Sequence, residues 1–282
     1  MVVEEQGPVR ATVRLTRHFG SSVITQRLSL SSTNGWVDVR NEVDWHEQHR
    51  LLKAAFPLAV RCSQARYEVA FGLVERPTHR NTSWDEARFE VCAHRFADLS
   101  EPGYGVALAN DCKYGYDVAG SVIRLSLLRG PTAPDPLADQ GVHRFTYRLI
   151  PHAGELGPGG VVAAAHDLND PLWPFRTTTH VGWAPPTASL LSVEPSSVVI
   201  DTVKRAEDGE EIVVRCYEAW GGRGRVRLRL PSNAVAAVRT DILEVGTAEL
   251  PLDHEGVAEV EVGPFEVVTV KATVAGALGA AC

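Results

Sequence analysis

The chain has 282 residues, of which 44% are hydrophobic and 22% are charged, so it can fill a folded core and is not a disordered polymer. Its net charge of −7 argues against nucleic acid as the main partner. It has no apolar run of about eighteen residues and its N-terminus is acidic, so we expect neither a membrane span nor a secretory signal. The five cysteines form no Cys-x-x-Cys pair, and their odd number favours free thiols in a reducing cytoplasm.

Short runs of alternating apolar and polar residues occupy the first half of the chain and predict β-strands. In Trp36–Trp45, for example, Val37, Val39 and Val43 fall on one face, because every second residue of a strand points the same way. The predicted strands are Arg10–Thr16, Val23–Leu30, Trp36–Trp45, Leu51–Val60, Ala65–Phe71, Arg88–His94, Gly105–Ala109, Ser121–Leu128 and Arg144–Ile150. We expect only one helical turn, at Thr82–Arg88, with Ser83 or Asp85 as its cap.

The second half begins with a stretch rich in Gly and Pro, which includes GELGPGG, NDPLWPF and WAPPT and predicts a connector rather than a core. Short strands then resume, and about six of them over ~85 residues indicate a small β-sandwich. These strands are Ser197–Val203, Glu211–Ala219, Arg223–Leu230, Ala234–Glu244, Val257–Val262 and Phe265–Val274. The predicted fold is all-β, with a large antiparallel β-sandwich at residues 1–152, a connector at 153–189, a small β-sandwich at 190–275 and a frayed tail at 276–282.

Several long phrases occur in a recognisable order, among them VDWHEQHRLLKAAFPL (Val43–Leu58), ERPTHRNTSWDEARFEVCAH (Glu75–His94), DLSEPGYGVALANDCKYGY (Asp98–Tyr116) and RCYEAWGGRGRVRL (Arg215–Leu228). Together they resemble the C-terminal β-region of α-mannosidases of glycoside hydrolase family 38, in the subgroup that includes cytosolic and vacuolar enzymes. The resemblance implies a galactose-mutarotase-like supersandwich that is incomplete at its N-terminus. It also implies retaining hydrolysis of α-mannosides, with zinc and a nucleophilic Asp in an N-terminal catalytic domain. No His-x-Asp triplet occurs in these residues, so we expect this chain to bind no cofactor.

The loop after Gly105–Ala109 is the first candidate site, with Asn110, Asp111, Lys113 and Tyr114 as tentative substrate-binding residues. Lys and Tyr side chains could donate hydrogen bonds to a sugar hydroxyl. The alternative is an ordinary turn, in which Asn and Asp cap the backbone and a glycine supplies a positive φ angle.

The segment RPTHRNTSWD supplies the second candidate site, with His79, Arg80 and Trp84 as tentative substrate-binding residues. Trp faces suit the C–H surfaces of sugars, and Arg suits hydroxyl or carboxylate partners. The alternative is a rigid loop held by ion pairs, for example Arg80 with Asp85 or Glu86, or a loop that packs on a neighbouring catalytic domain.

A metal site is not expected at His46 and His49, because residues three apart on a strand point to opposite faces. No catalytic acid, base or nucleophile can be assigned. Three hypotheses remain: the non-catalytic C-terminal part of an α-mannosidase, a stand-alone carbohydrate-binding β-sandwich, and an inactive orphan fragment. The expected partners are α-mannosides, a separate catalytic-domain chain and a second copy of this chain, with the protein in the cytoplasm.

Overall fold

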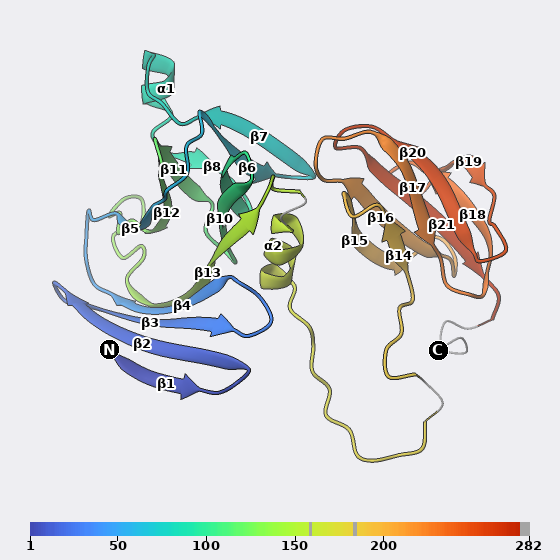
Figure 1. The fold of residues 1–282 in the computed structure, drawn as a ribbon, viewed down its shortest axis with the longest axis horizontal. Helices are drawn as coiled ribbons and strands as arrows, with labels where there is room; N and C mark the ends of the chain where they lie inside the picture. The colour runs from blue at the N-terminus through green and yellow to red at the C-terminus, as the bar shows by residue number, and fades with distance from the viewer. Residues whose placement is uncertain (158–159, 183–184, 277–282) are drawn as a thin grey trace. The chain divides into compact units, whose positions relative to one another are not determined.

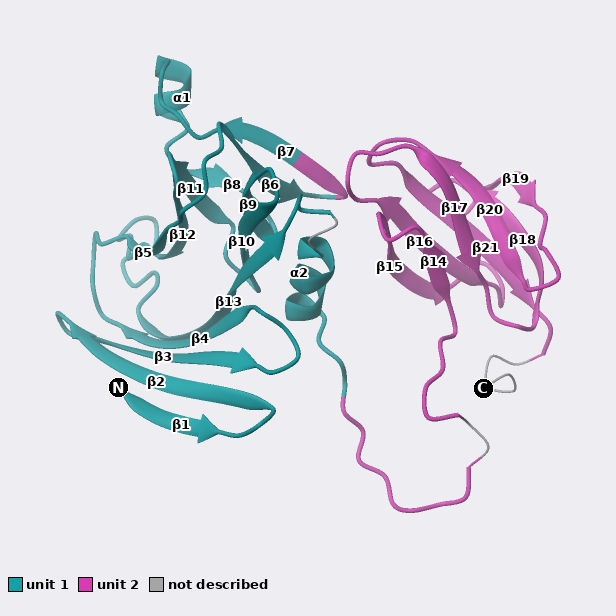
Figure 2. Cartoon of the chain, in the orientation of Figure 1, with its two compact units in different colours: residues 1–70, 74–173 teal, residues 71–73, 174–282 magenta. Residues whose placement is uncertain are grey.

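The computed structural model describes residues 1–157, 160–182 and 185–276. The chain divides into two compact units, shown in different colours in Figure 2. Unit 1 consists of Met1–Ala70 and Val74–Trp173, and unit 2 consists of Phe71–Leu73 and Pro174–Cys282. Both units are built from antiparallel strands, which confirms the predicted all-β class (Figure 1).

The larger sheet of unit 1 has nine strands in the order β1-β2-β3-β4-β13-β10-β9-β6-β7. Its strands are β1 (Val2–Gln6), β2 (Arg10–Phe19), β3 (Ser22–Ser31), β4 (Val37–Trp45), β6 (Gln64–Val69), β7 (Gly72–Pro77), β9 (Phe96–Glu101), β10 (Tyr104–Asn110) and β13 (Gly141–Ala153). The first two residues of β7 belong to unit 2. The first four strands form a continuous meander, drawn in blue in Figure 1. We call this the wide sheet.

The smaller sheet of unit 1 has four strands in the order β5-β12-β11-β8, and we call it the narrow sheet. Its strands are β5 (Leu52–Pro57), β8 (Val91–Cys92), β11 (Gly115–Ala119) and β12 (Val122–Leu128). The core of unit 1 brings together apolar residues of both sheets, including the fully buried Trp45, Leu108, Tyr116 and Ile123. The burial of such large side chains is the main driving force for joining the two sheets.

The helical turn expected at Thr82–Arg88 forms the short helix α1 (Ser83–Ala87). Its cap, however, is Thr82 rather than Ser83 or Asp85. The Thr82 hydroxyl accepts from the Asp85 backbone N–H at 3.1 Å, while the Asp85 carboxylate accepts from the Thr82 backbone N–H at 3.2 Å. This reciprocal pairing satisfies two N–H groups that a short helix would otherwise leave without partners.

A second helix, α2 (Val161–Asn169), lies inside the stretch predicted to be a connector, and no helix was expected there. Four of its first five residues are buried, namely Val161, Val162, Ala164 and Ala165. The helix packs on β10 and β13 of the wide sheet (Figure 1). This part of the predicted connector therefore contributes to the packed body of unit 1.

Unit 2 contains a three-stranded sheet, in the order β14-β17-β20, and a five-stranded sheet, in the order β15-β16-β21-β18-β19. Its strands are β14 (Ser192–Glu194), β15 (Val198–Arg205), β16 (Ile212–Glu218), β17 (Gly224–Arg229), β18 (Ala234–Thr240), β19 (Gly246–Leu250), β20 (Val257–Val262) and β21 (Val267–Val274). Both sheets contribute to one core, in which Val214, Leu228 and Val270 are almost completely buried. The C-terminal sandwich predicted from the strand spacing is confirmed.

Four cysteines, Cys62, Cys92, Cys112 and Cys216, are free thiols, as expected. The fifth, Cys282, and residues 277–281 of the predicted tail lie outside the described residues. No helix in the described part of the chain has the length and apolar character needed to cross a membrane.

Candidate functional site

The loop after β10 is held in place by the Asn110 side chain, which is almost completely buried. Its Oδ1 accepts from the backbone N–H groups of Cys112 and Lys113, at 2.9 and 2.5 Å. Its Nδ2 donates to the His94 carbonyl at 2.9 Å and to the Tyr116 hydroxyl at 2.7 Å. These contacts are the backbone caps of the predicted turn, and they leave Asn110 without a free group for a ligand. Gly115, which was expected to supply a positive φ angle, begins β11 (Gly115–Ala119) instead and has no positive φ.

Asp111 is also tied to the scaffold, because its Oδ2 accepts from the Thr146 backbone N–H at 2.8 Å. Its Oδ1 is buried and has no hydrogen-bond partner. The Lys113 ammonium lies 4.6 Å from the centre of the Phe145 ring. Tyr114 is 59% exposed and is the side chain of this loop that is most available to a ligand.

The second candidate segment is split by the structure. Trp84 lies on α1 and is 75% exposed, and the His79 ring lies 3.6 Å from the Asp85 carboxylate. Arg80 does not pair with Asp85 or Glu86, the partners expected for a rigid loop. It pairs with Asp117 of β11 at 3.2 Å instead.

Asp117 is the centre of a cluster of charges on the outer face of the narrow sheet, which we call the charged cluster. Arg80, Arg124 and Lys53 lie 3.2, 3.0 and 3.5 Å from its carboxylate. Lys53 also lies 2.6 Å from Glu90, which accepts a further hydrogen bond from Ser126. Three cations around one carboxylate that is only 10% exposed leave positive charge for an additional acceptor.

A pocket of about 680 Å³ opens beside the charged cluster. Arg80, Glu90 and Asp117 line it, together with apolar side chains that include Leu51 and Phe89. Leu51 and Phe89 are 54% and 64% exposed. Carboxylates, a guanidinium and an aromatic ring can together hold a polyhydroxylated ligand, because hydroxyls bind the polar groups and C–H faces cover the ring.

One wall of this pocket is fixed by Asp139, whose carboxylate accepts from the backbone N–H groups of Arg129 and Gly130, both at 2.9 Å. Burial by itself would raise the pKa of Asp139. The two N–H donors, with the nearby positive charges of His143 and Lys113, outweigh that effect and lower its pKa. The ionised carboxylate therefore fastens the loop after β12 to the end of that strand.

The seven predicted site residues are thus only partly brought together. Arg80 alone among them lines the 680 Å³ pocket, whereas His79 lies with Arg80 in a separate small pocket. The sequence analysis did not select Lys53, Glu90 or Asp117 as site residues, although Lys53 and Glu90 stand inside the recognised phrases and Asp117 directly follows one. The missing signal was spatial, because the pairing of β5, β12, β11 and β8 brings these distant residues together, with Glu90 directly before β8.

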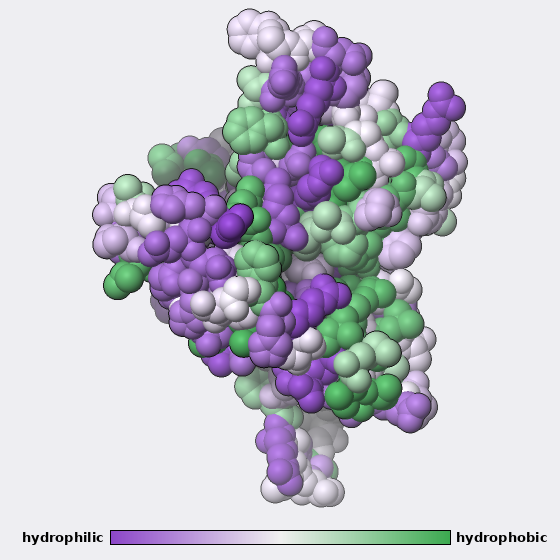
Figure 3. Space-filling view, turned by 90° about the vertical axis from the view of Figure 1, so that its left-hand side faces the viewer, coloured by the Kyte–Doolittle hydropathy of each residue, from purple (hydrophilic) through white to green (hydrophobic). Residues whose placement is uncertain are grey.

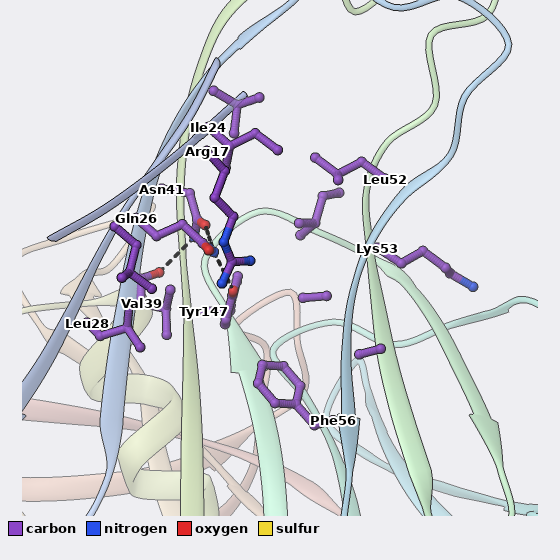
Figure 4. A pocket seen from close by; sticks show the side chains of 15 residues that line it. Arg17, Ile24, Gln26, Leu28, Val39, Asn41, Leu52, Lys53, Phe56 and Tyr147 are labelled. Carbon is purple, nitrogen blue, oxygen red and sulfur yellow. Dashed lines mark hydrogen bonds between the residues drawn. The ribbon is translucent and has the colours of Figure 1, made fainter. Parts of the chain in front are cut away.

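A second pocket, of about 340 Å³, lies between the two sheets of unit 1 (Figure 4). Its walls are mostly apolar, but Arg17, Gln26, Asn41 and Tyr147 form a polar group inside it. On the face of the molecule drawn in Figure 3, apolar side chains (green) lie next to hydrophilic ones (purple).

No three His, Cys, Asp or Glu side chains in the described ranges come close enough to hold a metal ion. These described residues therefore offer no fitting set of donors for zinc, which the resemblance places in a separate catalytic domain.

Comparison with known proteins places both units in one family. Residues 1–137 match the family model for the glycosyl hydrolases family 38 C-terminal domain, and residues 197–270 match that for the family 38 C-terminal beta sandwich domain. Alpha-mannosidase 2C1 of Homo sapiens is 48% identical over 228 residues, which cover 79% of this chain and 22% of that protein. Alpha-mannosidase of Saccharomyces cerevisiae is 38% identical over 225 residues, which cover 74% of this chain and 20% of that protein.

A solved alpha-mannosidase from Enterococcus faecalis has the same fold, with a TM-score of 0.78 at 18% identity over 96% of this chain and 34% of the other. This chain spans about a fifth of the length of the curated relatives that it matches. It belongs to glycosyl hydrolase family 38 and corresponds to the C-terminal β-region of that family's α-mannosidases.

Proposed function

We propose that this chain is the non-catalytic C-terminal part of an α-mannosidase and that it supports the cleft in which an α-mannoside binds. The observation that carries the proposal is the match of both units to C-terminal domains of the family. In this proposal another part of the polypeptide, or a separate catalytic-domain chain in the cytoplasm, performs retaining hydrolysis with zinc and a nucleophilic Asp.

The part played by this chain is to present polar groups to the sugar at the edge of that cleft. Arg80 would donate to a hydroxyl, while Glu90 and Asp117 would accept from hydroxyls in the 680 Å³ pocket. Because both carboxylates are paired with cations, they suit hydrogen-bond acceptance better than proton donation. Lys113 and Tyr114 remain candidates for a second set of contacts.

The test of the non-catalytic role is hydrolysis of p-nitrophenyl α-mannoside by the purified chain, with and without added zinc. We expect no release of p-nitrophenol above the rate without protein. Zinc-dependent turnover that follows this chain through purification would contradict the proposal.

A stand-alone carbohydrate-binding module is the second candidate function, and the pocket with the exposed Phe89 is the observation that favours it. Isothermal titration calorimetry with mannose oligosaccharides separates the two. Binding by this chain alone in the micromolar range, abolished by Asp117→Asn but kept by Arg40→Ala on the opposite sheet, would favour the second candidate. If Trp84→Ala abolished binding instead, the sugar would lie at α1.

A further inference from the structure

The two sheets of unit 1 have very different widths, since nine strands face four. The inner face of β3 extends beyond the narrow sheet, because Ile24 pairs with Val43 and Leu28 pairs with Val39, whose side chains are buried in the core. Ile24 and Leu28 are only partly buried, and Leu30 further along the same face is 49% exposed. An apolar strip of the wide sheet therefore has no opposite strand among the described residues.

The end of the narrow sheet beside this strip is β5, which pairs on one side with β12. No described strand pairs with its other side. The Leu58 N–H donates to the Ser121 carbonyl at 2.9 Å, and hydrogen-bonded pairs alternate along an antiparallel ladder. The N–H and C=O groups of Lys53 and Ala55 therefore point away from β12. They form an open edge that can pair with another strand.

The 340 Å³ pocket lies between this edge and the apolar strip (Figure 4). Gln26 donates to Asn41 and to the Tyr147 hydroxyl, at 2.9 and 3.0 Å, and Figure 4 shows Arg17 reaching towards these three side chains. No carboxylate within the described ranges lies within 4.0 Å of the Arg17 guanidinium. A cation beside apolar walls is complemented best by an acidic group brought in from outside.

We propose that the open edge of β5 binds an extended segment of another polypeptide as an added strand of the narrow sheet. The inward side chains of that segment are apolar, to cover the strip on β3, apart from one Asp or Glu that pairs with Arg17. Backbone hydrogen bonds to Lys53 and Ala55 supply affinity, and alternate side chains supply specificity. The side chains of this added strand would then fill the pocket.

The test uses the full chain and a fluorescent peptide, KTLTETLTK, whose inward Leu, Glu and Leu match this chemistry. We expect saturable binding by fluorescence polarisation. Arg17→Glu should weaken that binding by at least about tenfold. The matched control is Arg40→Glu, which makes the same charge change on the opposite face of the wide sheet, where β4 alternates sides at each residue. It should leave the dissociation constant within about twofold.

Two further peptides separate strand addition from non-specific attraction. Replacement of the central Glu by Lys should lower affinity for the natural chain and restore it for the Arg17→Glu variant. N-methylation of alternate amides on the edge-facing side should abolish binding, because it removes the backbone donors.

Several results would overturn the proposal. These are no binding at millimolar peptide, equal binding by the Arg17→Glu and natural chains, and indifference to N-methylation. Analytical ultracentrifugation checks a second copy as occupant. A dimer that the peptide does not dissociate, but that Ala55→Pro does, would assign the edge to self-association instead. Circular dichroism of each variant verifies that it folds.

Discussion

Asn110 shows how the buried position of one side chain decides its role. Its amide makes four hydrogen bonds, two to N–H groups of its own loop, one to a carbonyl and one to the Tyr116 hydroxyl. Burial raises the pKa of Tyr116, so this phenol stays protonated and can donate onwards to the Leu108 carbonyl at 3.0 Å. The amide and the phenol thus join β10 and β11 in two different sheets of unit 1.

We expect Asn110→Ala to lower the free energy of unfolding by about 3 kcal/mol, because it leaves buried donors and acceptors without partners. Urea denaturation measures the change. Tyr114→Ala, at an exposed position of the same loop, is the control and should cost less than about 1 kcal/mol. Equal losses for the two variants would show that the loop is not held by Asn110.

The composition of this loop predicts the turn, because Asn and Asp accept readily from nearby backbone N–H groups. It does not reveal the Tyr116 hydroxyl as a partner, since that contact depends on where β11 lies beside β10. For the same reason, the sequence assigned Arg80 to carboxylates five or six residues away rather than to Asp117. Whether Lys113, Tyr114, His79 and Trp84 bind substrate stays a prediction.

Asp139 supplies a pH-dependent prediction. Its pKa is lowered in the folded state, so its carboxylate stabilises the fold above the unfolded pKa of about 4, and this contribution is lost as the pH falls through the lower folded pKa. Asp139→Asn should therefore be less stable than the natural chain at pH 7. Urea denaturation from pH 7 to pH 3 should show the difference shrinking below about pH 4. A difference that stays constant down to pH 3 would contradict the role of the ionised carboxylate.

Among the secondary-structure elements, strands with one exposed face were the easiest to predict. Both β3 and β4 alternate along their length, and their predicted ranges lie close to the observed ones. By contrast, β9 was not predicted. Its residues Phe96, Ala97, Asp98 and Leu99 are all buried, so both faces of the strand are covered and the apolar-polar alternation disappears.

Helix α2 was missed for a related reason. Its first turns read VVAAA, which has no polar face from which a helical period could be recognised, and its N-cap Gly160 offers no capping side chain. Gly and Pro on both sides made the stretch resemble a connector. The helix is buried by its packing on β10 and β13. It is also held by a hydrogen bond of 2.8 Å that Arg148 donates to the Ala164 carbonyl.

The packing of α2 can be tested with two neighbouring alanines. Ala165 is fully buried, so Ala165→Asp should place a carboxylate against the wide sheet and lower the free energy of unfolding by about 3–5 kcal/mol, or prevent folding. Ala163→Asp makes the same chemical change at an exposed position and should cost less than about 1 kcal/mol. Chemical denaturation, with circular dichroism as the signal, measures both. Similar stability of the two variants would mean that α2 does not pack on the sheet.

At the scale of the whole molecule, composition predicts two β units with a stretch between them, but it does not define where the first unit ends. The packed part of unit 1 continues through α2. Only beyond it, at residues 170–182, is every described residue exposed and outside regular secondary structure. A boundary of this kind depends on tertiary contacts, because Gly and Pro mark changes of chain direction and not the loss of packing.

This exposed stretch predicts where a protease cuts first. Leu172, Trp173 and Phe175 are 98%, 79% and 89% exposed, on extended backbone that a protease can bind without unfolding a strand. Chymotrypsin should therefore cleave first after Phe175, while the bond after Trp173 is protected because Pro174 follows it. Mass spectrometry of a limited digest identifies the products.

The matched variant is Phe175→Ala, which should slow the first cut severalfold without changing the stability of either unit. Trp84 and Phe89 are also exposed, at 75% and 64%, but they lie in and beside α1, which is held by its capping pair. A first cut at either of these residues would show that the segment around α1 opens more readily than the connector. In that case α1 would be the less stable part of the chain, and a ligand bound at Trp84 would have to order it.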